Sequence, residues 1–288
     1  MAPRLTQETS PTAREGLQAA PEHKFVTIKK LNQTLDEEAG KASPSLYLIF
    51  NSVTKADLNK IERARERGQT QRSLRLTTHY EALDLLIIKV PTSQHDVANE
   101  EFKWDFQDRI TAMNLRPELR AYGTTKYQGR GVSKEADAAY RPFSARPPPP
   151  HGTDWPTLVI ETGWSESLAR LRVDAQLWLA NSGGDVRTVV VLIAVCRTSR
   201  RIIIEKWEPV AVSSNRQITR SMPTATPTAT PTTRVQHITI EANSVTGAPL
   251  ILDFEKIFLR QPVPPQEHDL IFTQPDLSTW AEKVWGTG

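Results

Sequence analysis

The chain has 288 residues, of which 38% are hydrophobic, so it is long enough to bury a sizeable core in one large domain or two small ones. Its net charge of +3 is too small to argue for a nucleic-acid partner on charge alone. The single cysteine, Cys196, excludes an intrachain disulfide and favours a reducing compartment. We therefore expect an intracellular protein of the cytoplasm or nucleus.

Neither a secretory signal nor a membrane span is predicted. Residues 1–20 are polar and contain proline, which predicts a disordered N-terminus without the apolar segment of a signal peptide. The longest apolar run, VVVLIAVC at 189–196, is far too short to cross a bilayer. We expect no membrane partner.

The first third of the chain predicts a small helix and strand region. SLYLIF at 45–50 is typical of a strand, and TKADLNKIERARERG at 54–68 of a helix that ends at its glycine. Residues 74–91 are rich in β-branched and leucine residues and predict one or two strands before Pro91. Residues 21–94 are therefore interpreted as an N-terminal extension of the main core.

The better-patterned part of the chain begins at residue 95. Phe102, Phe106, Ile110 and Met113 fall on one helical stripe, with Asp96 as the expected cap. Three strands, a helix and a further apolar strand follow, in the ranges 118–129, 133–142, 156–163, 165–185 and 186–196. A helix that joins two apolar strands predicts a parallel crossover within a central mixed sheet.

The rest of the chain predicts mainly β structure. A strand at 201–210 is followed by a Thr- and Pro-rich insert that cannot pack. Further β structure is expected at 235–241 and 248–257, with a short helix at 277–285. The predicted organisation is a disordered N-terminus, an N-terminal extension, a core with its insert, and a Pro-rich tail, at 1–20, 21–94, 95–260 (insert 211–234) and 261–288.

Two acidic residues stand out because they occupy apolar strands. Asp137 lies within SKEADAAYRP, and Glu161 ends the run LVIE. Neighbouring strands lie about 5 Å apart, so carboxylates at matching ends can share a hard divalent cation. Magnesium there would neutralise a phosphodiester oxygen and lower the pKa of an attacking water. The alternative is that both are ordinary strand-end acids bonded to backbone or arginine.

These residues carry a resemblance to a known superfamily. The order helix, three strands, helix, strand over 96–209 resembles the PD-(D/E)XK restriction-endonuclease-like superfamily, in which the second strand carries Asp and the third Glu-x-Lys. Asp137 matches the first acid and Glu161 the second. Residues 133–195 are also similar to uncharacterised fungal proteins with this domain. The resemblance implies a restriction-endonuclease-like α/β fold with a central mixed sheet flanked by helices, Mg²⁺ at the acids, and nucleic acid, DNA more than RNA, as partner.

The sequence departs from this pattern at the lysine. Gly163 stands two residues after Glu161, where lysine is expected, and Asp174 stands near the helical position to which some relatives have moved it. On a helical wheel Arg172 falls at the edge of the buried stripe and Arg170 toward solvent. Arg172 is therefore the candidate to stabilise a phosphate by charge, although arginine is a poor general base.

The resemblance also implies a third acid from the first core helix, and Glu101 is favoured over Asp105 for it. The predicted site is thus Asp137, Glu161 and Arg172 for catalysis, with Asp137, Glu161 and Glu101 as magnesium ligands. The leading function is a metal-dependent, PD-(D/E)XK-type endonuclease-like protein acting on DNA phosphodiesters, impaired by Gly163. The alternative is a pseudo-nuclease scaffold that binds nucleic acid or protein without hydrolysis.

Overall fold

The computed structural model describes residues 13–41, 44–70, 74–90, 93–123, 125–143, 155–164, 168–195, 200–210 and 231–286. Cys196 and positions 211–230 of the Thr- and Pro-rich insert lie outside these ranges, as do residues 1–12 of the N-terminus. Within the described ranges, none of the helices combines the length and apolar character needed to span a bilayer.

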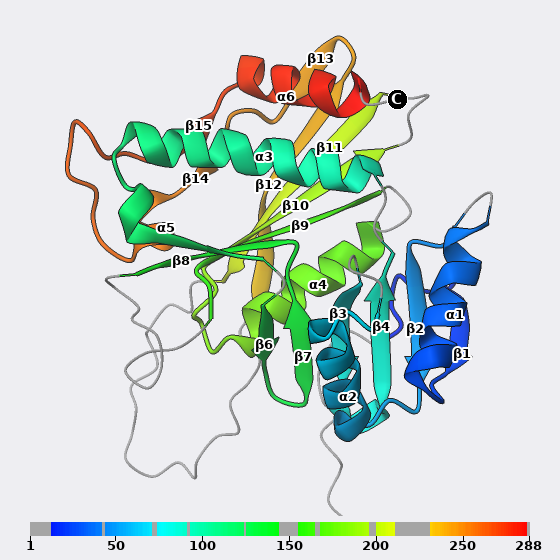
Figure 1. Cartoon of the computed structure of the whole chain (residues 1–288). Coiled ribbons are helices and arrows are strands. Elements are labelled where there is room, and N and C mark those ends of the chain that lie inside the picture. The colour runs from blue at the N-terminus through cyan, green and yellow to red at the C-terminus, as the bar shows by residue number, and fades with distance from the viewer. Residues whose placement is uncertain are drawn as a thin grey trace, which may run out of the picture.

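The N-terminal part of the chain supplies four strands of a six-stranded sheet covered by two helices, and residues 126–135 supply the other two (Figure 1). Its strand order is β1-β2-β4-β3-β7-β6, with bounds Glu22–Lys24, Tyr47–Asn51, Leu85–Lys89, Arg75–Tyr80, Val132–Glu135 and Lys126–Gln128. A short 3-10 turn, η1 (Glu81–Leu83), joins β3 to β4. The covering helices are α1 (Ile28–Ala39) and α2 (Lys55–Glu66). The predicted helix at 54–68 is confirmed, and Thr54 caps it together with Asp57.

Strands β2 and β4 of this sheet are buried on both faces. Leu48 of β2 and Ile88 of β4 pack under α1 and α2, whereas Ile49 and Ile87 face the opposite side. Successive side chains of a strand point to opposite faces, so a strand covered on both sides needs apolar residues throughout. This explains the uninterrupted apolar runs YLIF and LLII in the sequence.

The second sheet has seven strands and mixed direction. Its order is β13-β12-β11-β10-β9-β8-β5, with bounds Ser244–Thr246, Thr232–Glu241, Arg201–Pro209, Thr188–Val195, Leu158–Trp164, Ala138–Pro142 and Leu119–Tyr122. Strands β9 and β10 are parallel and are joined by α4 (Leu168–Asn181), as the sequence predicts. The neighbouring pairs β8–β9 and β10–β11 are antiparallel. The α/β class and the central mixed sheet flanked by helices are confirmed.

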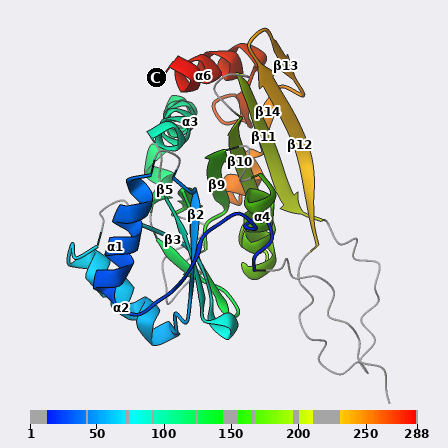
Figure 2. The same cartoon turned by 90° about the vertical axis from the view of Figure 1, so that its right-hand side faces the viewer.

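Helices cover both faces of the second sheet. On one face lie α3 (Ser93–Ala112) and α6 (Gln274–Gly286), which run beside each other in Figure 2. The short helix α5 (Phe254–Phe258), the turn η2 (Arg116–Glu118) and the pair β14 (Leu250–Leu252) and β15 (Leu270–Phe272) complete the chain. Residues 248–257, for which the sequence predicts β structure alone, therefore form a strand followed by a helix.

The helix α4 lies between the two sheets. Leu171 and Leu179 pack on the second sheet, and Arg170 reaches β3 of the first, where its Nη2 lies 3.4 Å from Thr78 Oγ1. The prediction that Arg170 faces solvent is wrong, since its residue is 0% exposed. A helical wheel finds the apolar stripe that faces one sheet, but it cannot show that a second sheet covers the opposite side.

The chain passes from one sheet to the other at Asp137. Where the sequence predicts one strand at 133–142, the structure has β7 in the first sheet and β8 in the second. Likewise the predicted strand at 118–129 is β5 of the second sheet and β6 of the first. Alternation of residues along a strand identifies its faces but not the sheet to which it pairs. Asp137 therefore stands at the seam between two sheets rather than inside one strand.

Candidate functional site

Asp137 and Glu161 come together where β8 begins, beside the middle of β9. The prediction that Glu161 ends its strand is wrong, since β9 continues to Trp164. The antiparallel pair β8–β9 aligns Ala138 with Ile160, so the two acids follow at the next position of the ladder. Asp137 Oδ2 accepts a hydrogen bond of 2.9 Å from the backbone N–H of Thr162. Both residues are buried, with Asp137 6% and Glu161 1% exposed.

A lysine from the first sheet is bonded to the first acid. Lys89, the last residue of β4, places Nζ 2.5 Å from Asp137 Oδ2 and 2.5 Å from the carbonyl oxygen of Thr162. Its ammonium thus sits between a carboxylate and a backbone carbonyl, two hard oxygen ligands that converge on one point. Lys89 is 5% exposed, so this contact is closed to bulk water.

A second lysine and a tryptophan hold the second acid. Trp178 of α4 donates a 2.6 Å hydrogen bond from Nε1 to Glu161 Oε1. Lys134 of β7 lies with Nζ 3.4 Å from the same oxygen and 3.0 Å from Asp174 Oδ1. Asp174 in turn accepts a 2.8 Å hydrogen bond from Arg170 Nη2.

These contacts form one buried group that we call the six-charge cluster. It contains three cations and three anions, all buried: Lys89, Lys134, Arg170, Asp137, Glu161 and Asp174. The members come from both sheets and from α4, so the cluster joins the three layers. Its formal charges cancel, which is the condition under which ionised groups are tolerated in a protein interior.

Two acids of the cluster have pKa values shifted in opposite directions. Burial raises the pKa of Glu161 to about 7; Lys134 opposes this shift, and Asp137 and Asp174 add to it by repulsion. Burial also works against the charge of Asp174, but Arg170 and Lys134 outweigh it and lower the pKa of that carboxyl. Asp174 therefore stays ionised at neutral pH, whereas Glu161 is the group of the cluster that takes up a proton near neutral pH.

The other two predicted site residues are held elsewhere. Glu101 of α3 pairs with Lys283 of α6, with 2.7 Å between Oε2 and Nζ. Arg172 of α4 donates from Nε and Nη2 to Glu205 of β11, at 3.1 and 2.6 Å. From α3, Asn99 reaches β9 beside the acids, where its Oδ1 lies 3.5 Å from Thr162 Oγ1.

The arrangement of the acids does not fit a magnesium ion as it stands. The oxygens of Asp137 and Thr162 that would ligate a metal are already bonded to Lys89 Nζ. Among the residues that the structure describes, no group of three or more His, Cys, Asp or Glu side chains is placed to hold a metal. A divalent cation would also add two charges to a buried cluster whose formal charges already balance.

Lys89 and Lys134 were missed by sequence reasoning, although a signal for one of them exists. LLIIKV and LVIE each place a charged residue directly after an apolar run, Lys89 in one and Glu161 in the other. The same criterion that selects Glu161 therefore selects Lys89. Lys134 has no such signal, since its neighbours Ser133 and Glu135 are polar as well.

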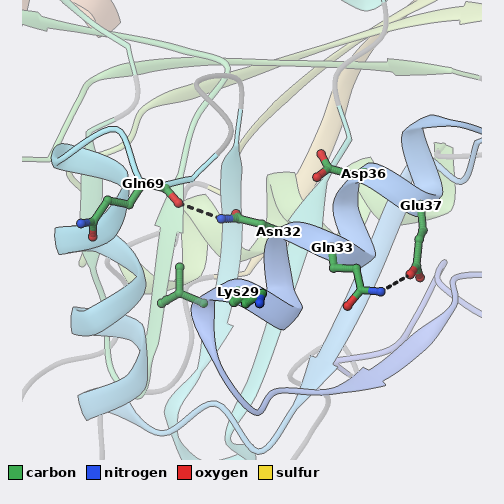
Figure 3. Close-up of a pocket in the computed structure, with 7 residues that line it drawn as sticks. Lys29, Asn32, Gln33, Asp36, Glu37 and Gln69 are labelled. Carbon is green, nitrogen blue, oxygen red and sulfur yellow. Dashed lines mark hydrogen bonds between the residues drawn. The ribbon is translucent and has the colours of Figure 1, made fainter.

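A separate open groove lies beside α1, with a volume of about 640 Å³. Its lining comes from α1 and from Gln69 after α2, and Figure 3 shows Asn32 bonded to the backbone oxygen of Gln69 and Gln33 bonded to Glu37. None of the six charged residues lines it. The groove is therefore distinct from the candidate site.

The fold and the site together define an α/β protein with a buried charged cluster at the seam between its two large sheets. No family model matches the chain, and no curated protein matches it. Among solved structures, it is similar to a protein from Anabaena variabilis described as a "putative nuclease belonging to DUF820", with 13% identity and a TM-score of 0.38. The similarity covers 71% of this chain and 90% of that one.

Proposed function

We propose that this chain is a nuclease-like protein that binds nucleic acid, DNA in preference to RNA, without hydrolysing it. The observation that carries this proposal is the position of Lys89 Nζ, 2.5 Å from both Asp137 Oδ2 and the Thr162 carbonyl oxygen. Nucleic acid is proposed as the partner because Asp137 and Glu161 match the acid pair of the PD-(D/E)XK pattern.

The lysine takes the place that a metal would need. Hydrolysis of a phosphodiester at such an acid pair requires a divalent cation to activate water and neutralise the phosphate. Magnesium prefers six oxygen ligands at about 2.1 Å in octahedral geometry, and it gives up its own waters reluctantly. At Asp137 it would have to displace an ammonium that is already desolvated and bonded to two oxygens.

The charge balance supports the same proposal. Glu161 and Asp174 face Lys134, and Asp137 faces Lys89, so each acid has an internal cation. Replacing these contacts by a divalent ion would leave the displaced ammonium buried without its partner, at a cost of several kcal/mol. A chain that retains the acids but supplies its own cations is expected to be stable without metal.

The second candidate is a magnesium-dependent DNA endonuclease that uses Asp137 and Glu161. One observation favours it: Lys89 and Lys134 bring ammonium groups to the acids although position 163 is glycine. In that function one of these lysines would supply the positive charge beside the phosphate. Arg172, whose Nε and Nη2 are bonded to Glu205, is left out of this candidate.

One assay separates the two candidates. The full chain is incubated with supercoiled plasmid and Mg²⁺ or Mn²⁺, beside Glu161→Gln and a control, Glu241→Gln, at an exposed glutamate of β12. The proposal expects no nicking by any of the three, together with a gel shift that weakens as salt rises. Nicking by wild type and control that vanishes in Glu161→Gln would establish the endonuclease instead. Absence of any shift with DNA or RNA would overturn nucleic acid as partner.

A further inference from the structure

A second charged group lies around Glu205 of β11, outside the six-charge cluster. Glu205 is 0% exposed, and its carboxylate accepts hydrogen bonds from Arg172, from Arg234 Nη1 at 2.7 Å and from Trp207 Nε1 at 3.0 Å. His237 Nδ1 lies 3.3 Å from Oε1 of the same carboxylate. We call Arg172, Arg234 and His237, held around Glu205, the Glu205 patch.

The patch is built where the second sheet extends past α4. The antiparallel pair β11–β12 sets His237 directly opposite Glu205, and a register shift at Lys206/Trp207 sets Arg234 opposite Trp207. Arg172 reaches the same carboxylate from α4. The side chains of Arg172, Arg234 and His237 are 37, 42 and 40% exposed, so all three lie at the surface over a buried acid.

The charges of the patch do not cancel. One carboxylate faces two guanidinium groups, which leaves one positive charge with the imidazole neutral. Burial works against the charge of Glu205, but hydrogen bonds from Arg172 and Arg234 bring its pKa down to about 2, so it stays ionised. The arginines are thus fixed by a permanent anion beneath them, and the side-chain entropy that a ligand would otherwise have to overcome is already lost.

Both arginines retain N–H groups for a ligand. Arg172 uses Nε and Nη2 on Glu205, and Arg234 uses Nη1. Within the described part of the chain, Arg172 Nη1 and Arg234 Nε and Nη2 bond to no protein atom. A planar guanidinium with paired N–H donors matches the geometry of phosphate oxygens.

We infer that the Glu205 patch binds a phosphate group of a nucleic-acid backbone. This inference rests on the proposed function and names the surface that would carry it. The patch is an open surface with one net charge, which is too little to retain a free phosphate. A nucleic-acid strand makes further contacts through its neighbouring phosphates, and several weak contacts to one polymer add up to measurable affinity.

The patch and the acid pair share one row of the sheet. Glu205 pairs with Val191 of β10, and Val191 pairs with Glu161 of β9. Two strand spacings separate the two glutamates, about 10 Å. A strand of nucleic acid on the patch would therefore lie over the α4 side of the sheet, beside the helix that covers the acids.

The test compares single arginine substitutions in the full chain. Binding of a short fluorescein-labelled DNA, single-stranded and duplex, is followed by anisotropy across a salt series for wild type, Arg234→Gln, Arg234→Lys and Arg201→Gln. Arg201 is the matched control, since it is an exposed arginine of β11, the strand that carries Glu205, and lies outside the patch. Unfolding midpoints confirm that each variant folds.

The expected result is a loss of affinity of about tenfold for Arg234→Gln, with the slope of log K against log salt reduced by about one. Arg234→Lys is expected to fall between wild type and Arg234→Gln, because lysine retains the charge but not the paired donors. Arg201→Gln should match wild type.

Three outcomes overturn the inference, and they differ in what they mean for the proposed function. If wild type binds DNA and Arg234→Gln binds it equally well, the patch is not the binding surface, while the proposed function stands. If wild type binds neither DNA nor RNA, the proposed function fails and the inference with it. Competition by inorganic phosphate as strong, per phosphate, as by unlabelled DNA would identify a small-anion site and also overturn the inference.

Discussion

Glu161 of β9 and Glu205 of β11 lie in the same row of the seven-stranded sheet, because each is the register partner of Val191 in β10. Both are buried, yet the pKa of Glu161 is raised to about 7 and that of Glu205 is lowered to about 2. Burial opposes ionisation at both positions. Glu205 is bonded by two arginines, whereas Glu161 shares Lys134 with Asp174, so only Glu205 gains enough from its partners to remain charged.

The free energy of unfolding of Glu161→Gln is expected to increase relative to that of wild type as pH rises. Between the ordinary carboxyl pKa of 4.5 and the folded value of about 7, the unfolded chain has lost the proton that folded Glu161 still holds. Wild type therefore loses up to about 1.4 kcal/mol of unfolding free energy per pH unit in this window through Glu161. Glutamine does not titrate, and it still accepts the hydrogen bond from Trp178.

Urea unfolding of both proteins at pH 5 and pH 7.5 measures this difference, and the comparison between proteins cancels the other titrating groups. The difference in unfolding free energy, variant minus wild type, should be more positive at pH 7.5 than at pH 5. A gap that stays constant, or a loss that grows with pH, would mean that Glu161 is ionised in its pair with Lys134 throughout.

Asp174→Asn is expected to destabilise the protein strongly. It leaves Arg170 and Lys134 buried without the carboxylate that both of them contact. Removing one partner from a buried ion pair costs about 3–5 kcal/mol. Urea unfolding at neutral pH measures the loss, with Asp108→Asn at an exposed position of α3 as control, expected within about 0.5 kcal/mol of wild type. Equal stability of the two variants would show that the cluster does not depend on Asp174.

Lys89→Ala is expected to open a weak site for a divalent cation. The substitution removes the ammonium from between Asp137 Oδ2 and the Thr162 carbonyl oxygen and leaves both oxygens without that donor. Manganese that binds only the folded state would then stabilise it by about 1.4 kcal/mol at about ten times its dissociation constant. The thermal unfolding midpoint of the variant should rise with Mn²⁺, and that of wild type should not.

The double variant Lys89→Ala with Asp137→Asn is the control for this experiment, since it lacks the carboxylate and should not respond to Mn²⁺. A wild-type midpoint that rises with Mn²⁺ as much as that of Lys89→Ala would show that Lys89 does not occupy the cation position. It would then favour the endonuclease.

Glu205→Gln is expected to lower stability at neutral pH, by about 1–3 kcal/mol, because it weakens hydrogen bonds that two arginines make to a charged acceptor. The folded pKa of Glu205 is depressed from 4.5 to about 2, so its contribution is present above pH 4.5 and is lost as pH falls toward 2. The difference from wild type should therefore shrink between pH 7 and pH 3 in urea unfolding. A difference independent of pH would assign the effect to packing rather than charge.

The local elements and the positions of the two acids could be predicted from the amino-acid sequence. The capped helix α2, the parallel crossover from β9 through α4 to β10 and the mixed sheet follow from apolar periodicity and capping residues, which depend on neighbours along the chain. The meeting of Asp137 and Glu161 follows from the pairing of β8 with β9. Apolar periodicity identifies which face of a helix or strand is apolar.

The elements that cover each face of a helix or strand, and the charged groups that form ion pairs, depend on the packing of the tertiary structure. Lys89 lies 48 positions from Asp137 in the chain and in a different sheet, so no local pattern pairs them. Arg170 is buried because the first sheet covers the side of α4 that a wheel assigns to solvent. Ion pairs of this kind are fixed by the packing of whole layers, since each charge is tolerated inside only where a distant element brings its partner.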